Sequence, residues 1–259
     1  MNKQELNPAR ALYYGLFSKL FVFTENENRY EGLDTTLDVL IDNPIDDNSR
    51  EALREIKEFI SLGGHESLIR EYDAIFHHPS GNIVRTTASI YCDGVESGKK
   101  TLEVKNFLAK TRIRRNEKTY KETEDSVGFL VTFMYELVEL IIMGEESYGT
   151  VQHCIFVEIM NEFIDEFIEA LYENESSEIY KSVAVVFNTF VSFERLYFDV
   201  QKPLPKPKTQ EEQVSCETIS VEEEKRRAQN RLEKSAESVM KSCALEDDYF
   251  EDENGISEM

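Results

Sequence analysis

Apolar residues recur at helical spacing through the first 200 residues of this 259-residue chain. An early run places Leu12, Leu16 and Leu20 on one face, and a later run places Leu130 and Leu137 on another. Only short stretches alternate in the way that a half-buried strand requires. The pattern therefore predicts an all-α fold, with a single helical, bundle-like domain over residues 1–200.

Capping residues, prolines and glycines predict where some of these helices begin and end. We expect the first helix to begin at Asn7-Pro8, because Asn can cap a helix and Pro fits its first turn. A third helix should run from about Ser49 to Gly63-Gly64, where a glycine can take the left-handed conformation that ends a helix. Thr119 and Glu122 have the spacing of a capping box and predict the start of the longest apolar helix.

The composition changes at Gln201. Residues 201–210 are rich in Pro and Lys, which predicts a stiff linker that cannot continue a helix. Residues 211–259 form a charged tail, in which Ser220 and Glu223 have the spacing to open a solvated helix. The last stretch, Leu245 to Met259, has seven acidic side chains and no basic one. We therefore expect a charged, largely disordered extension after the helical domain.

The charge of the chain limits its partners. Its 51 acidic and 29 basic residues give a formal net charge of −22 at pH 7, which argues against binding nucleic acid and suits a cationic partner. The N-terminus has no basic region followed by an apolar run, and the most apolar stretch, Phe129 to Met143, is interrupted by Glu136 and Glu139. We expect a cytoplasmic protein without membrane insertion.

Motifs for catalysis are missing from the sequence. None of the four histidines has a Glu three residues before it, so the Glu-x-x-His pairs of a di-metal bundle are absent. The glycine-rich phosphate loops and the G-x-S-x-G elbow are absent too. We predict no catalytic residues, no metal site, no cofactor and no enzymatic activity.

Three short motifs follow one another in the middle of the chain. The first is Tyr72-Asp73-Ala74-Ile75-Phe76, the second is Ser89-Ile90-Tyr91-Cys92-Asp93, and the third is Glu122-Thr123-Glu124-Asp125-Ser126. In this order they resemble the TorD/DmsD/NarJ family of redox-enzyme maturation chaperones, with its Tyr-x-x-Leu-Phe-like, Ser-Val-Tyr-Leu-Asp-like and Glu-Pro-x-Asp-His motifs. Thr123 replaces the family's Pro and Ser126 its His, which indicates a divergent member.

The resemblance, which covers roughly residues 6–200, implies an all-helical cytoplasmic chaperone, present as a monomer or homodimer. Its expected partner is the precursor of an exported molybdoenzyme, bound through its twin-arginine leader, its body or both, to assist cofactor insertion and delay export. A formate dehydrogenase is one candidate client. The residues expected to bind the peptide, through apolar contacts and carboxylates, are Tyr72, Ile75, Phe76, Ser89, Tyr91, Glu122, Asp125 and Ser126.

Two other functional classes remain open from the residues alone. A helical adaptor could recruit a basic partner through its acidic surface, without any role in metalloenzyme maturation. A hydrolase built on a helical bundle would need a site that none of the motifs indicates. At the residue scale, Tyr72, Ile75 and Phe76 also suit plain core packing, and Asp125 suits plain stabilisation of a helix N-terminus.

Overall fold

The all-α prediction is confirmed for the part of the chain that the computed structural model describes, residues 3–23, 28–79, 81–118 and 120–204. The α-helices and the single π-helical turn are α1 (Lys3–Phe21), α2 (Leu33–Asp42), α3 (Asp47–Phe76), α4 (Ala88–Asp93), α5 (Lys99–Ala109), α6 (Val127–Ile142), α7 (Tyr148–Ile155), η1 (Phe156–Met160), α8 (Asn161–Glu173) and α9 (Ile179–Phe198). The described residues up to Pro203 form one compact unit. The predicted tail, and the linker from residue 205 on, lie outside the described residues.

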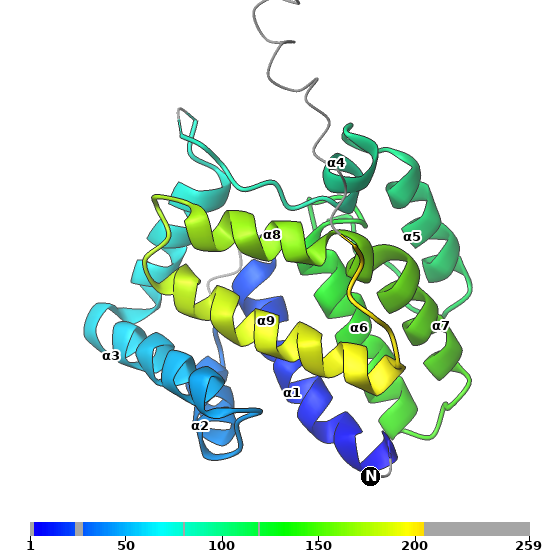
Figure 1. Ribbon diagram of the computed structural model, residues 1–259, viewed down its shortest axis with the longest axis horizontal. Helices are drawn as coiled ribbons and strands as arrows, with labels where there is room; N and C mark the ends of the chain where they lie inside the picture. Colours follow the sequence, from blue (N-terminus) through cyan, green and yellow to red (C-terminus); the bar gives the residue numbers. More distant parts are fainter. Residues whose placement is uncertain (1–2, 24–27, 80, 119, 205–259) are drawn as a thin grey trace, which may run out of the picture. The chain divides into compact units, whose positions relative to one another are not determined.

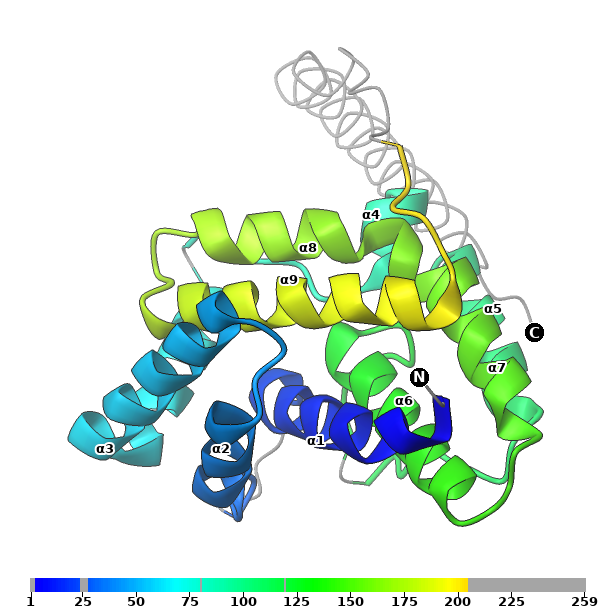
Figure 2. The ribbon, with the colours of Figure 1, turned by 60° about the horizontal axis from the view of Figure 1, so that its bottom comes forward.

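The helices pack around α1, α6 and α9. α1 lies along α6, and α9 packs against α3 on one side and α8 on another. Figure 1 shows α8 and α9 running side by side, with α2 and α3 near one end of the pair and α4, α5 and α7 near the other. Figure 2 shows the same neighbours from a second direction. Within the described residues, the one β-bridge joins Thr87 to Ser126.

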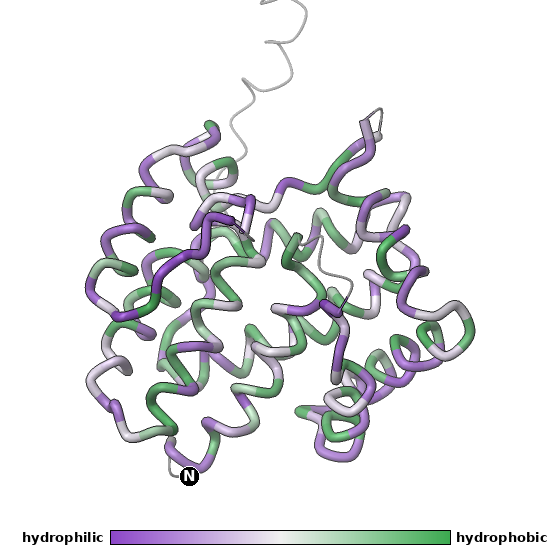
Figure 3. Tube along the Cα trace, turned by 180° about the vertical axis from the view of Figure 1, so that it is seen from behind, coloured by the Kyte–Doolittle hydropathy of each residue, from purple (hydrophilic) through white to green (hydrophobic). Residues whose placement is uncertain are grey.

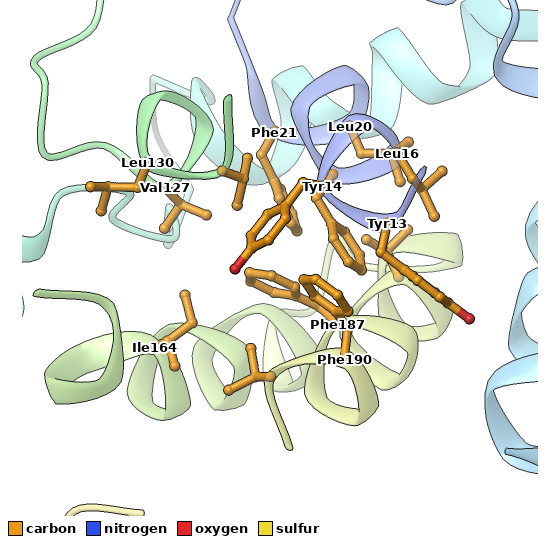
Figure 4. Close-up of a cluster of buried hydrophobic side chains, with 14 of the residues drawn as sticks. Tyr13, Tyr14, Leu16, Leu20, Phe21, Val127, Leu130, Ile164, Phe187 and Phe190 are labelled. Carbon is orange, nitrogen blue, oxygen red and sulfur yellow. The ribbon is translucent and has the colours of Figure 1, made fainter. Parts of the chain in front are cut away.

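An aromatic core joins α1 to α9. Figure 4 shows Phe187 and Phe190 of α9 pointing at side chains of α1, among them Tyr14 and Phe21. The ring centroids of Tyr14 and Phe190 lie 4.8 Å apart, and those of Phe21 and Phe187 lie 5.2 Å apart. Apolar and polar residues recur along each helix, as the colours in Figure 3 show, so every helix has one face for this core. Most of the apolar residues that recur at helical spacing in the sequence are thus buried in the structure.

Three predicted helix boundaries change in the structure. α1 begins at Lys3, and the Asn7 side chain accepts a hydrogen bond from Arg10 instead of capping a helix. α3 continues to Phe76, with Gly64 (φ 68°) as a left-handed interruption at the place where a helix end was predicted. The predicted start of the long helix at Thr119 and Glu122 is wrong, because α6 begins at Val127 and Ser126 is its N-cap.

None of the helices described is both long and apolar enough to cross a membrane. α6, which contains most of the apolar stretch singled out in the sequence, ends at Ile142 after 16 residues. Most of its apolar residues are buried, and it packs against both α1 and α7.

Candidate functional site

Hydrogen bonds to Asp125 connect the start of α4 to the start of α6. Its side chain is fully buried, and its Oδ2 accepts hydrogen bonds from the backbone N–H (3.0 Å) and the hydroxyl (2.6 Å) of Ser89. The Asp125 carbonyl accepts a third bond from the N–H of Ala88 (2.9 Å). Ser126, also buried, caps α6 by accepting a bond from the N–H of Phe129 (3.2 Å). Two of the predicted peptide-binding residues, Asp125 and Ser89, are therefore bonded to each other inside the protein, and a third, Ser126, caps α6.

The first motif lies in the core. Tyr72, Ile75 and Phe76 are between 0% and 5% exposed at the end of α3. The rings of Tyr72 and Phe76 are 4.8 Å apart, and the Tyr72 hydroxyl donates to the carbonyl of Phe21 (3.4 Å). This geometry matches the core-packing interpretation of the three residues. Of the three, only Tyr72 also lies beside the residues around Glu122 that are described next.

Glu122 is the predicted site residue with an incompletely paired charge. Its side chain is half-buried and accepts a hydrogen bond from the N–H of Phe23 (3.3 Å). Burial raises the pKa of the Glu122 carboxyl to about 7, although the bonds from Phe23 and Thr86 and the charge of Arg29 favour the ionised form. Among the described residues, no lysine or arginine forms an ion pair with it within 4 Å. Glu122 is therefore a carboxylate that a cation would stabilise.

Aromatic rings and an arginine surround this carboxylate. The guanidinium of Arg29 lies 4.5 Å from the ring centroid of Tyr30 and 4.7 Å from that of Tyr72. The Glu122 carboxylate adds to the effect of burial in raising the pKa of the hydroxyls of Tyr72 and Tyr120. We refer to Arg29, Tyr30, Tyr72, Tyr120 and Glu122 as the Glu122 cluster. The sequence predicted two of the five members, and nothing in its pattern marked Arg29, Tyr30 or Tyr120.

Several buried polar atoms in and beside the Glu122 cluster have no hydrogen-bond partner within the described part of the chain. They are Arg29 Nε and Nη2, Tyr30 Oη, Tyr120 Oη, Thr123 Oγ1 and Asp125 Oδ1. Buried polar groups are almost always hydrogen-bonded, either to protein or to water. These atoms lie on two segments of the chain, Arg29–Tyr30 and Tyr120–Asp125.

Tyr91 lies nearby, on the segment that joins the cluster to α8. Its hydroxyl donates to the carbonyl of Arg85 (2.9 Å), and its ring centroid is 5.7 Å from that of Phe163 on α8. Burial, and after it the charge of Glu166, raises the pKa of this hydroxyl. Thr86, beside Arg85, bonds to Glu122. The segment from Arg85 to Tyr91 therefore runs from the Glu122 cluster to the acidic helix α8.

A second acidic surface lies between α8 and α9. A groove of about 530 Å³ there has an apolar floor that includes Ile168 and Val185, and Glu169 and Glu173 lie along it. Both carboxylates are exposed and form no ion pair with any described residue. Tyr172, which is 51% exposed, lies between them in the sequence. The acidic residues of α8 stand out in the sequence, but their position on a groove depends on the packing of α9.

The described residues offer no group of three or more His, Cys, Asp or Glu side chains that could hold a metal ion. Around Glu122, charge and aromatic rings lie side by side, an arrangement that suits binding. A carboxylate next to tyrosine rings is a suitable environment for a guanidinium, which can bond to the first and stack on the second.

Comparisons with known proteins found one family profile and a solved structure that are similar to this chain. The profile of the family described as nitrate reductase delta subunit matches residues 42–169, a range that contains all eight predicted site residues. A solved structure of a candidate redox enzyme maturation protein from Archaeoglobus fulgidus is similar, with a TM-score of 0.47 and 18% sequence identity, over 70% of this chain and 93% of that chain. No curated protein matches the chain.

This family consists of maturation chaperones rather than catalysts. The motifs around Tyr72, Tyr91 and Glu122, the helical fold and the family match all agree. Residues 42–169 of this chain match the nitrate reductase delta subunit family, the NarJ/TorD-like group of redox-enzyme maturation chaperones.

Proposed function

We propose that this chaperone binds the precursor of an exported molybdoenzyme through its twin-arginine leader, with Glu122 as the anchor for an arginine. It would hold the precursor in the cytoplasm, as a monomer or homodimer, while the cofactor is inserted and export is delayed. The body of the client is a second contact of the same partner. A formate dehydrogenase remains one candidate client, on the basis of what divergent family members serve.

The observation that carries this proposal is the half-buried Glu122 carboxylate with a pKa of about 7 and no ion-pair partner among the described residues. An arginine of the leader would restore the charged form of Glu122 by a charge-assisted hydrogen bond. Burial, and after it the charge of Glu122, raises the pKa of the hydroxyls of Tyr72 and Tyr120, so both rings lie close to this carboxylate. A cation followed by apolar residues is the chemistry that such a cluster recognises.

Calorimetric titration of the full chain tests this proposal. The probe is a synthetic peptide with two consecutive arginines followed by an apolar stretch, compared with the same peptide carrying glutamines in place of the arginines. We expect Glu122→Gln to weaken binding of the arginine peptide about tenfold, the loss expected for one charge-assisted hydrogen bond, and to leave the glutamine peptide unaffected. Binding of the arginine peptide should also weaken as salt is added.

The pH dependence provides a second readout. Because a bound cation favours ionised Glu122, affinity should rise about tenfold from about pH 5.5 to about pH 8 in the native chain. Glu122→Gln should remove most of that rise. An affinity for the arginine peptide that is the same in the two chains at both pH values would refute Glu122 as the anchor.

A matched control is the double variant Glu169→Gln with Glu173→Gln, which removes two exposed carboxylates from the α8–α9 groove. We expect it to bind the arginine peptide as the native chain does. If this variant alone loses affinity, the leader site moves to α8 and the Glu122 assignment is wrong. The alternative function, an adaptor that recruits basic partners, draws its support from the same groove and would be favoured by that result.

The client itself can be identified by purifying the tagged full chain from its own cells. Recovery of an immature molybdoenzyme would support the proposal. Recovery of unrelated basic proteins, with no redox enzyme among them, would favour the adaptor.

A further inference from the structure

Three arginines of this acidic protein, Arg112, Arg114 and Arg115, line a groove. Lys110, Arg112, Arg114, Arg115 and Lys118 lie within one short connection between α5 and α6. Part of this connection forms one wall of a groove of about 620 Å³. A basic concentration in a chain of net charge −22 is not needed for solubility, and the leader site proposed above does not use it.

The opposite wall of the groove is a stripe along α6. It consists of Phe129, Phe133, Glu136, Leu140 and Met143, which recur every three or four residues and so share one helix face. This stripe is about 21 Å long at 1.5 Å per residue, the length of about four helical turns. Met143 is 71% exposed at one end of the stripe. Phe129, Phe133 and Leu140 are only 2% to 7% exposed, so Met143 offers most of the apolar surface on this wall.

The cations on the rim are incompletely neutralised. Arg112 pairs with Glu145 (2.6 Å), and Arg115 pairs with Glu124 (3.2 Å). Arg114, which is exposed, donates only to backbone carbonyls, at 2.6 Å to Thr111 and 2.7 Å to Ile113, with a longer bond to Leu108 (3.4 Å).

Among the described residues, no carboxylate lies within salt-bridge distance of Arg114, Lys110 or Lys118. Within the groove lining the single carboxylate is that of Glu136. The rim thus has spare positive charge that a ligand carboxylate can neutralise.

Two buried polar atoms lie near the rim. Arg115 Nε and Tyr120 Oη have no hydrogen-bond partner within the described part of the chain. Tyr120 lines the groove, while Glu122, two residues further on, faces Phe23 on the other side of this loop. The groove and the Glu122 carboxylate are therefore both built from the connection between α5 and α6.

We propose that this groove binds an acidic segment of a protein partner, with an apolar side chain of the segment against Met143 and a carboxylate at Arg114. The ligand class is the opposite of a cationic leader, so this surface is a second recognition site. A chaperone with two such sites can hold two segments of opposite charge at once, which raises the affinity for any client that carries both.

Fluorescence anisotropy with the full chain tests the proposal. The probes are three labelled amphipathic peptides that share the same apolar residues and carry glutamates, glutamines or lysines on the polar face. We expect the glutamate peptide to bind at least about tenfold more tightly than the lysine peptide, and salt to weaken its binding. Equal affinity of the glutamate and lysine peptides would overturn the proposal.

Substitutions locate the contact. We expect Arg114→Glu to weaken binding of the glutamate peptide at least about tenfold, whereas Lys181→Glu, the same charge change at an exposed position of α9, should have no effect. Because Arg114 also bonds to the end of α5, the variant Met143→Ser provides a second test that removes none of those bonds. Unchanged affinity in this variant would refute the groove as the site.

Two further results separate this proposal from others. Glu122→Gln should leave the affinity for the glutamate peptide unchanged, so a failure of the leader proposal would not affect this one. Tighter binding by a synthetic peptide of residues 245–259 than by any glutamate probe would assign the groove to the chain's own acidic sequence, and would overturn the assignment to a separate partner.

Discussion

The two side-chain oxygens of Asp125 lie in different environments. Oδ2 accepts two hydrogen bonds from Ser89, whereas Oδ1 is buried without a partner among the described residues. An aspartate in this position contributes mainly by satisfying the N–H and hydroxyl of Ser89, which are themselves buried. A peptide could reach Asp125 only if the junction between α4 and α6 opened, so its role in peptide binding stays a prediction.

We expect Asp125→Ala to lower the free energy of unfolding by about 3 kcal/mol, because it leaves two buried donors unsatisfied. Urea denaturation followed by circular dichroism measures this change. The exposed Asp42 provides the control, and Asp42→Ala should cost less than about 0.5 kcal/mol. Equal stability of the two variants would show that the Asp125–Ser89 bonds contribute nothing net.

Glu122 should make stability depend on pH in the direction opposite to an ordinary ion-paired carboxylate. Its pKa in the folded protein, about 7, lies above the ordinary value of 4.5, so the folded state holds the proton more tightly. The stability that this provides is complete below the unfolded pKa and is lost as the pH rises through about 7. We expect Glu122→Gln to raise the free energy of unfolding at about pH 8 by at most about 3 kcal/mol, and to leave it unchanged near pH 4.

Urea denaturation at several pH values measures this difference. Glu136→Gln, at an exposed position of α6, is the control and should change stability little at any pH. If Glu122→Gln destabilises the protein at pH 8, Glu122 is ionised and satisfied in the fold without any ligand. The proposed role as a vacant anchor would then be wrong.

At the scale of elements, the close approach of α1 and α6 depends on Gly128. A Cβ built on Gly128 would lie 2.6 Å from the carbonyl oxygen of Phe21 and 3.0 Å from the Cα of Val22. These are backbone atoms, so the clash cannot be relieved by turning a side chain. α6 therefore needs glycine at position 128, because the backbone that follows α1 lies directly against it.

We expect Gly128→Ala to destabilise the protein by about 2–3 kcal/mol, because α1 and α6 must separate to admit one methyl group. Gly149→Ala in α7 is the matched control, since nothing lies within 4 Å of its built Cβ, and it should stabilise by up to about 1 kcal/mol through helix propensity. Thermal denaturation of the two variants gives the comparison. Similar effects in both would show that the α1–α6 contact is adjustable.

At the scale of the molecule, an internal ion pair links helices that are distant in the sequence. Arg10 of α1 and Glu194 of α9 are fully buried and bond at 2.6 Å, and Glu194 also accepts from Tyr14 (2.6 Å). Gln152 of α7 accepts a bond from Arg10 (3.1 Å), so three helices share one polar network inside an apolar core. A network of this kind adds specificity to the packing, because each helix must meet the others in one register.

The sequence by itself determined the class of the fold and the identity of the motifs. Periodic apolar residues such as Leu12, Leu16 and Leu20 define helix faces locally, since the period depends only on helix geometry. The three motifs were sufficient to predict the family, and Gly64 was recognised as a break from its own conformational freedom. These features depend only on residues that are neighbours in the chain, so they can be recognised from the sequence alone.

Only the tertiary structure decided which motif residues can be reached. Asp125 and Ser89 are far apart in the sequence, and their mutual bond explains why an acidic residue before a helix is internal here. Capping rules placed the start of α6 too early, because the chain from Thr123 to Asp125 is held by contacts with the segment at Thr86 to Ser89. The Arg29 side chain reaches Glu122 through packing of separate segments, and burial, which no local pattern encodes, raises the pKa of Glu122.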